Sequence, residues 1–246
     1  MQKKYPAHIR IYEDGKRKYQ TCKEHSYVTA KYAGEALRDV NLQQSAFTAG
    51  LLHDMGKMKS FYREYLEKRI EGEDVRRGSV IHTFAGVRYI LERYHKGGNY
   101  LEYEDMASEM IAYAIGAHHG LFDCVDENRN NGFLHRLQTH PEGDTEAMEH
   151  YFQECIAENE LDKMFLKATS EIEKVVEKIS AIENAEEIAF LLGLLSRLIT
   201  SAVIEGDRRD TAEFMNDAVF PSEADVDFWG NLLRRVERKL EKLVTD

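Results

Sequence analysis

Interruptions of helical periodicity are scarce along this chain of 246 residues, and that scarcity constrains the fold most. Only three prolines are present, and no Ser-rich or Gly-rich run separates one part from another. Because prolines and glycine clusters end helices and mark linkers, their scarcity favours one mainly helical domain. The 43% hydrophobic content is ample for a core. We therefore predict an all-α helical bundle that forms a single domain over residues 1–246.

One stretch near the N-terminus departs from helical spacing. Residues 8–12 alternate polar and apolar side chains, and a second short run over 17–20 follows Asp14-Gly15. Asp-Gly between two extended runs indicates a hairpin, so we expect a small N-terminal β-hairpin. Thr21 and Glu24 then have the spacing of a capping box, which predicts the start of the first helix.

Apolar spacing predicts further helices. The residues from 121 to 143 are rich in Asn, Asp and Gly, which predicts an irregular loop of about twenty residues. A helix over 188–204 is apolar nearly all round, so we expect it to be central and buried and to end at Gly206-Asp207. A last helix is capped by Ser222, and its apolar stripe consists of Phe228, Leu232, Val236, Leu240 and Leu243.

The stretch Gly50-Leu51-Leu52-His53-Asp54-Met55-Gly56-Lys57 reads as the end of a buried helix. We expect Gly56 to close this helix in the left-handed conformation, so that His53 and Asp54 point to one spot beyond its end. A ring nitrogen and a carboxylate side by side suit a divalent metal. A lone His-Asp pair is more often a helix-end hydrogen bond, so the interpretation depends on the rest of the chain.

Other predicted helix ends offer the same residue types. Together they supply five imidazoles and two carboxylates, enough for two divalent ions bridged by Asp54. Such paired ions hydrolyse phosphoesters. The remaining histidines lie in polar or loop contexts, although His135 and His140 can approach from the predicted loop. The candidate ligands are His25, His53, Asp54, His82, His118, His119 and Asp207, and the histidines left out are His8, His95, His135, His140 and His150.

Charge is unevenly distributed. The net charge is −11, and residues 141–190 hold 14 acidic and four basic side chains, so one face is acidic and the rest nearly neutral. The interval 57–77 holds seven basic residues with three aromatics among them, a pattern that can bind single strands. We expect Lys57, Lys59 and Arg63 to line an open channel for such a strand, although any amphipathic surface helix shows the same pattern.

Cysteine usage and hydropathy bear on compartment. Three widely spaced cysteines without a Cys-x-x-Cys pair indicate neither a disulfide framework nor a thiolate zinc site. No apolar run approaches the length of a membrane span, and no signal-type segment follows the polar start. We expect a soluble, cytoplasmic protein with no membrane partner.

The order His25, His53-Asp54, His82, His118-His119, Asp207 resembles the HD superfamily of metal-dependent phosphohydrolases, whose fold is an all-helical bundle. The resemblance is closer to the HD nuclease domain of the type I CRISPR-associated nuclease-helicase. It covers nearly the whole chain and is specific in order, in spacing and in the double histidine. The opening hairpin and the segment Asp207-Arg208-Arg209-Asp210-Thr211 look most like the type I-C branch.

This resemblance implies a ligand set and a function. One ion would be held by His25, His53, Asp54 and Asp207, and the other by Asp54, His82, His118 and His119. Lys57 matches a lysine beside the site, where it could neutralise charge on the phosphate, although a surface lysine is the plainer reading. The ions would be Mn²⁺, Fe²⁺, Co²⁺ or Ni²⁺, with Zn²⁺ or Mg²⁺ as alternatives.

The family cuts single-stranded DNA during CRISPR interference, an antiviral defence. By resemblance, the partners are single-stranded DNA, a helicase portion in the same or a second chain, and an RNA-guided effector complex. No Gly-x-x-x-x-Gly-Lys-Ser/Thr segment is present, which predicts a stand-alone subunit or an excised domain. Two alternatives stay open: a phosphohydrolase of nucleotides or cyclic dinucleotides, whose cyclic-dinucleotide branch carries a Gly-Tyr-Pro signature absent here, and a catalytically silent docking domain.

Overall fold

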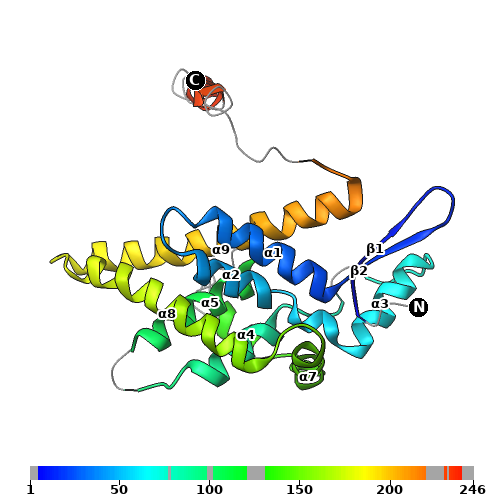
Figure 1. Ribbon diagram of the computed structural model, residues 1–246, viewed down its shortest axis with the longest axis horizontal. Coiled ribbons are helices and arrows are strands. Elements are labelled where there is room, and N and C mark those ends of the chain that lie inside the picture. The colour runs from blue at the N-terminus through cyan, green and yellow to red at the C-terminus, as the bar shows by residue number, and fades with distance from the viewer. Residues whose placement is uncertain are drawn as a thin grey trace.

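The computed structural model describes residues 5–76, 79–98, 102–120, 131–219, 230–231 and 233–239 (Figure 1). A helical bundle follows a small N-terminal hairpin, which confirms the predicted all-α class. The elements are β1 (Pro6–Ile11), β2 (Arg17–Thr21), α1 (Cys22–Ala36), α2 (Gln43–Leu52), the 3₁₀ turn η1 (Met55–Met58), α3 (Ser60–Ile70), α4 (Phe84–Tyr94), α5 (Tyr103–Ala117), α6 (Gly132–Gln138), α7 (Asp144–Glu154), α8 (Glu158–Ser180) and α9 (Ala185–Asn216).

The hairpin leads directly into the first helix. β1 and β2 pair antiparallel with Ile9 opposite Tyr19, and Gly15 in the turn has a positive φ of 77°. Thr21 accepts a hydrogen bond from the Glu24 backbone N–H while the Glu24 side chain accepts one from the Thr21 backbone. The predicted capping box is therefore confirmed, and it fixes where α1 begins.

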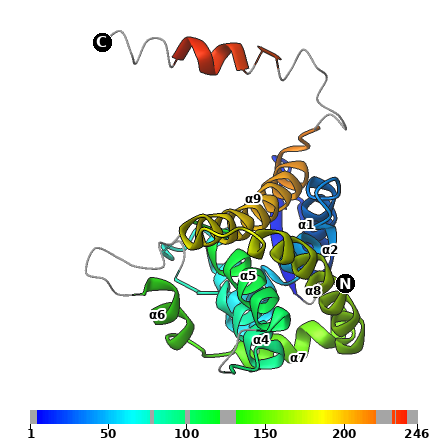
Figure 2. The ribbon, with the colours of Figure 1, turned by 90° about the vertical axis from the view of Figure 1, so that its left-hand side faces the viewer.

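The core surrounds α2 rather than the helix that we expected to be central. α2 contacts α1, α5, α8 and α9, and its side chains Ala46, Ala49, Leu51 and Leu52 are fully buried. Figure 2 shows α9 crossing α5, with α1 and α2 beside it. Because α2 is enclosed on several sides, its C-terminal end opens into the interior of the bundle.

The prediction for α9 is wrong in two respects. The helix continues through Gly206 and Asp207 to Asn216, because a single glycine does not end a helix that packs closely against a neighbour. Its first half is also only partly buried, because Phe190, Leu194 and Leu198 are 69%, 52% and 39% exposed. The all-round apolar pattern therefore provides an exposed apolar face as well as a core face.

By length and composition, α9 is also apolar enough to cross a membrane. The core helix of a soluble protein passes the same test, so this is weak evidence for a span. Our expectation that no apolar run approaches that length was nevertheless too strong.

Two other predicted segments are only partly described. Residues 121–130 of the predicted loop lie outside the described residues, and α6 occupies part of the remainder, where we expected no helix. Of the predicted last helix, residues 230–231 and 233–239 are helical, and Val236 of its stripe is 49% exposed. Ser222, Phe228, Leu232, Leu240 and Leu243 lie outside the described residues.

Gly206 allows α9 and α1 to approach closely. A Cβ added at this residue would lie 2.5 Å from the Thr29 carbonyl oxygen and 3.2 Å from the Ala33 nitrogen. Both obstacles are backbone atoms of α1, which cannot move aside as a flexible side chain can. The helices therefore pack at this distance only because residue 206 has no side chain.

We predict that Gly206→Ala lowers the free energy of unfolding by about 1–3 kcal/mol, because the helices must separate to admit a methyl group. Gly193→Ala, in the exposed half of the same helix, meets nothing within 4 Å and should raise it by about 0.5–1 kcal/mol. Chemical denaturation of both variants measures the difference. Equal tolerance of the two changes would contradict the close-packing argument.

Candidate metal centre

His53 and Asp54 lie where α2 gives way to η1. His53 is the C-cap of α2 and Asp54 is the N-cap of η1, and both are buried. Gly56 lies inside η1 and does not have the positive φ that we predicted. An added Cβ at Gly56 would instead collide with the His82 carbonyl oxygen. The glycine is therefore required by a close backbone approach that brings His82 beside Asp54.

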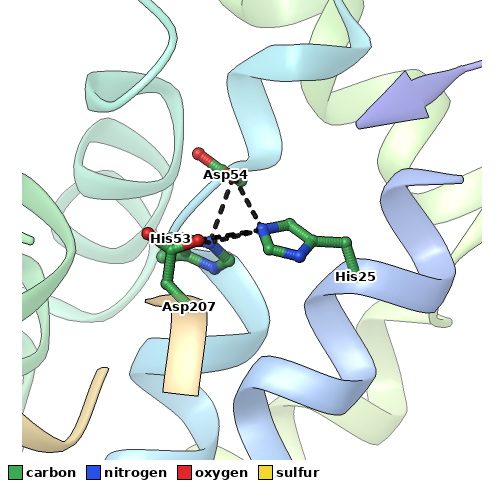
Figure 3. Close-up of side chains that lie close together, drawn as sticks. All are labelled: His25, His53, Asp54 and Asp207. Atoms are coloured by element: carbon green, nitrogen blue, oxygen red, sulfur yellow. Dashed lines mark hydrogen bonds and ion pairs between the residues drawn. The ribbon is translucent and has the colours of Figure 1, made fainter. Parts of the chain in front are cut away.

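The other candidate ligands reach this point from several elements. His25 comes from α1, Asp207 from α9, His82 from the segment before α4, and His118 and His119 from the end of α5. Figure 3 shows His25, His53, Asp54 and Asp207 converging. Ligand atoms of three groups each lie within 4.8 Å of one another: His25, His53, Asp54 and Asp207; Asp54, His82 and His119; His118, His119 and Asp207. All seven sequence-predicted residues thus meet in one cluster.

The Asp54 carboxylate lies between two sets of imidazoles. Its Oδ2 is 3.2 Å from His25 Nε2 and 3.1 Å from His53 Nε2. Its Oδ1 faces His82 Nε2 at 3.5 Å and His118 Nε2 at 3.7 Å. Oδ1 and His118 Nε2 are buried without a hydrogen-bond partner. Buried polar atoms without partners are rare, and a cation on the Oδ1 side would satisfy both atoms.

Hydrogen bonds at the far side of the rings determine which nitrogen faces the cluster. Nδ1 of His53 lies 2.7 Å from the Gly50 carbonyl oxygen, and Nδ1 of His118 lies 2.6 Å from that of Ile115. A carbonyl oxygen only accepts, so each Nδ1 donates and each Nε2 faces the interior of the cluster, where it is the nitrogen available to a metal. His82 and His119 also direct Nε2 atoms at each other, 3.0 Å apart. This orientation is typical of metal-binding histidines, so the residues fit divalent ions.

Electrostatics keeps Asp54, His82 and His118 in the charge states that bind metals. Burial would raise the pKa of Asp54, but the charges of His53 and Lys57 outweigh it and hold that pKa well below its usual value. Burial lowers the pKa of His82 to about 4 and also lowers the pKa of His118. At neutral pH the cluster therefore combines an anionic Asp54 with neutral imidazoles at His82 and His118, which are the forms that bind metals.

Burial lowers the pKa of His53, but Asp54 and Asp207 outweigh burial and raise that pKa. His25 is shifted in the same direction. Burial lowers its pKa, but hydrogen bonds with Asp207, Asp210 and Asp54 outweigh burial and raise the pKa to about 10. In the metal-free cluster this ring carries a proton, which a metal on Nε2 must displace.

Lys57 is not the surface lysine of the plainer reading. Its side chain is 6% exposed, and Nζ lies 2.6 Å from Asp54 Oδ2. Burial opposes its charge, but Asp54 outweighs burial and raises the pKa of Lys57. A permanent cation therefore lies against the central carboxylate.

Asp210 is a residue that the sequence reasoning missed. Its Oδ2 lies 2.5 Å from His25 Nδ1, on the side of the ring away from the cluster. Gln20 Nε2 donates to both Asp210 oxygens, at 3.0 and 2.8 Å. The signal was the spacing of Asp207 and Asp210, which places both on one helix face. It was hidden because we expected the helix to end at Asp207.

His8, which the sequence analysis left out, also adjoins the cluster. Its ring packs edge-on against His25 with centroids 4.6 Å apart, and Nε2 lies 3.4 Å from Thr211 Oγ1. The strand β1 brings it there. His135 and His140 belong to none of the donor groups found among the described residues.

The prediction that Lys57, Lys59 and Arg63 line an open channel is wrong. Lys59 is 2% exposed and paired with Asp144, while Lys57 is buried against Asp54. Tyr62 and Tyr65 are also buried, because α3 turns these aromatics toward the protein interior. Of the three proposed channel residues, only Arg63 is not buried, and it pairs with Glu67.

Fold and cluster together define a helical bundle with a buried His/Asp centre whose residues could hold divalent ions. Residues 23–142 match the family model described as HD domain, which supports the HD superfamily predicted from the sequence. HD domains are generally metal-dependent hydrolases. The matched segment contains six of the seven candidate ligands and stops before Asp207. No curated protein matches the sequence.

We predict that Asp210→Ala weakens binding of the ion at His25 by about 10–100-fold, because His25 loses the partner that orients its ring. Calorimetric titration of metal-free protein with Mn²⁺ measures the change. Glu205→Ala, an exposed position on the same helix, is the matched control and should bind as the wild type does. Unchanged affinity in Asp210→Ala would show that this carboxylate does not support the centre.

Proposed function

We propose that this protein is a metal-dependent nuclease that hydrolyses phosphodiester bonds of single-stranded DNA with two divalent ions. The observation that carries the proposal is the Asp54 carboxylate, whose two oxygens face separate imidazole sets. A carboxylate in that position suits a bridge between two ions. Paired ions activate water and stabilise both the attacking and leaving oxygens at phosphorus.

The chain's own residues would have distinct roles. We propose that His25, His53 and Asp207 hold one ion with Asp54, and that His82, His118 and His119 hold the other. Lys57 Nζ would turn from Asp54 Oδ2 to a phosphate oxygen, because binding of cations relieves the carboxylate of its need for this partner. Mn²⁺, Fe²⁺, Co²⁺ or Ni²⁺ suit this imidazole-rich set, with Zn²⁺ or Mg²⁺ as alternatives.

The choice of DNA rests on the sequence resemblance to the CRISPR-associated HD nuclease, in which the opening hairpin and the segment 207–211 look most like the type I-C branch. One structural observation supports it: both carboxylates of the segment 207–211, which contributes to that resemblance, contact His25. We propose the same partners, namely a helicase portion and an RNA-guided effector complex, in antiviral defence in the cytoplasm. The net charge of −11 disfavours indiscriminate binding to duplex DNA.

Circular single-stranded DNA tests the proposal. We predict that metal-stripped protein leaves the circle intact and that added Mn²⁺, Co²⁺ or Ni²⁺ restores cutting. Asp54→Ala should reduce cutting to background because the bridge is lost, while Glu205→Ala cuts normally. Gel analysis of the circle, with metal content measured in parallel, gives both readouts.

Parallel substrates separate the alternatives. Turnover of a nucleotide or cyclic dinucleotide without DNA cutting would replace the nuclease by a small-molecule phosphohydrolase. Metal-loaded protein that turns over neither substrate would favour the docking domain, and full activity of Asp54→Ala would refute the two-metal arrangement.

A further inference from the structure

A buried ionic triad lies near the metal centre, and none of its members belongs to the donor groups found among the described residues. Asp144 at the start of α7 pairs with Lys59 Nζ through Oδ1 at 2.5 Å and with Arg88 Nη1 through Oδ2. The three side chains are 2%, 8% and 5% exposed for Lys59, Arg88 and Asp144. Burying charges this deeply costs several kcal/mol per ion before pairing, so the triad calls for an explanation.

Charge balance does not explain Lys59. Arg88 already neutralises Asp144, and it also donates to the carbonyl oxygens of Leu137 at 2.9 Å, Arg136 at 3.0 Å and Thr139 at 2.6 Å. Arg88 and Asp144 thus form a complete pair that fastens the connection from α6 to α7. Lys59 adds a second buried cation to one carboxylate.

What Lys59 adds is a bond to the segment that carries His82. Its Nζ donates to the Ile81 carbonyl oxygen at 3.0 Å. This oxygen belongs to the peptide bond that leads into His82, in a segment that is neither helix nor strand. Residues in this segment lack the regular backbone hydrogen bonds that hold a ligand residue in place on a helix. Asp144 in turn holds the Lys59 ammonium in place.

The two sides of the metal cluster differ in how the backbone of each ligand is fixed. His25, His53 and Asp207 lie on or directly at the ends of helices α1, α2 and α9. His82 lies in the irregular segment. Its own carbonyl packs closely against Gly56, and the preceding carbonyl, of Ile81, accepts the hydrogen bond from Lys59. Loss of the Lys59 bond should therefore affect the ion at His82 and not the ion at His25.

We propose that Lys59, held by Asp144, is a positioning residue for His82 and thereby for the second metal ion. The proposal rests on the two-ion function above and adds that the two ions depend on different parts of the chain. Lys59 contacts neither ion nor substrate in this role; it acts through the backbone of residues 81 and 82.

Lys59→Met is the direct test, since it keeps the length of the side chain, removes the donor and leaves Asp144 paired with Arg88. With Mn²⁺, wild-type protein should bind two ions per chain and give the electron paramagnetic resonance spectrum of a coupled pair. The variant should bind one ion with unchanged affinity and give the six-line spectrum of isolated Mn²⁺. The second ion should bind at least about tenfold more weakly, as for loss of an outer-shell partner.

Three variants separate positioning from general stability. Lys163→Met, on the exposed surface of α8, should retain both ions. Arg88→Met destabilises the triad but keeps the Lys59 bond to Ile81, so it should also retain both. Lys59→Arg keeps a cationic donor and should restore the coupled spectrum. If Lys59→Met lacks the helical circular dichroism of the wild type, Lys59→Gln is titrated in its place and judged by the same outcomes.

The outcomes distinguish this proposal from the proposed function. Wild-type protein that binds a single ion refutes the two-metal function whatever the variant does. Wild-type protein with two ions and a Lys59→Met variant that also keeps two coupled ions refutes the positioning role alone. Loss of both ions in Lys59→Met, or equal loss in Arg88→Met, likewise refutes it, because the effect would then not be selective for His82.

Discussion

The shared carboxylate of Asp54 is the interaction on which the centre depends. Removing a carboxylate from water is costly unless partners replace the lost hydration. Here the compensation is one-sided: Lys57, His25 and His53 surround Oδ2, whereas Oδ1 has no hydrogen-bond partner. A cation on the Oδ1 side would complete the set. The bundle thus buries a carboxylate oxygen without a partner, and a divalent ion is suited to bind it.

Close backbone approaches make that arrangement possible. Gly56 admits the His82 carbonyl beside η1, Gly86 admits the Leu52 carbonyl beside α4, and Gly206 admits α1 beside α9. In each case the obstacle to a Cβ is backbone. The cluster is therefore assembled by elements drawn closer together than side chains would allow, and its short distances follow from packing as much as from attraction between the ligands.

Much of the fold and of the cluster could be predicted from the sequence because the signals were local. The capping box at Thr21, the hairpin turn and the helix ends at His53 and His118 depend on neighbours in the chain. The rest depends on contacts between distant residues. Gly56 looked like a helix stop, whereas its real constraint is the distant His82 carbonyl. Asp210 was missed because the helix was expected to end at Asp207, and its partner His25 lies 185 residues away.

For the same reason, hydropathy did not predict burial, and basic charge did not predict exposure. Composition along α9 predicted a buried helix. Burial depends on what packs against each face, however, and Phe190 is 69% exposed. Likewise Lys57 and Lys59 looked like channel residues, although each is enclosed against a carboxylate that the fold supplies. In this chain the buried lysines act as internal counterions. In the proposed nuclease, positive charge for the DNA backbone at the centre would therefore come from the bound ions and not from Lys59.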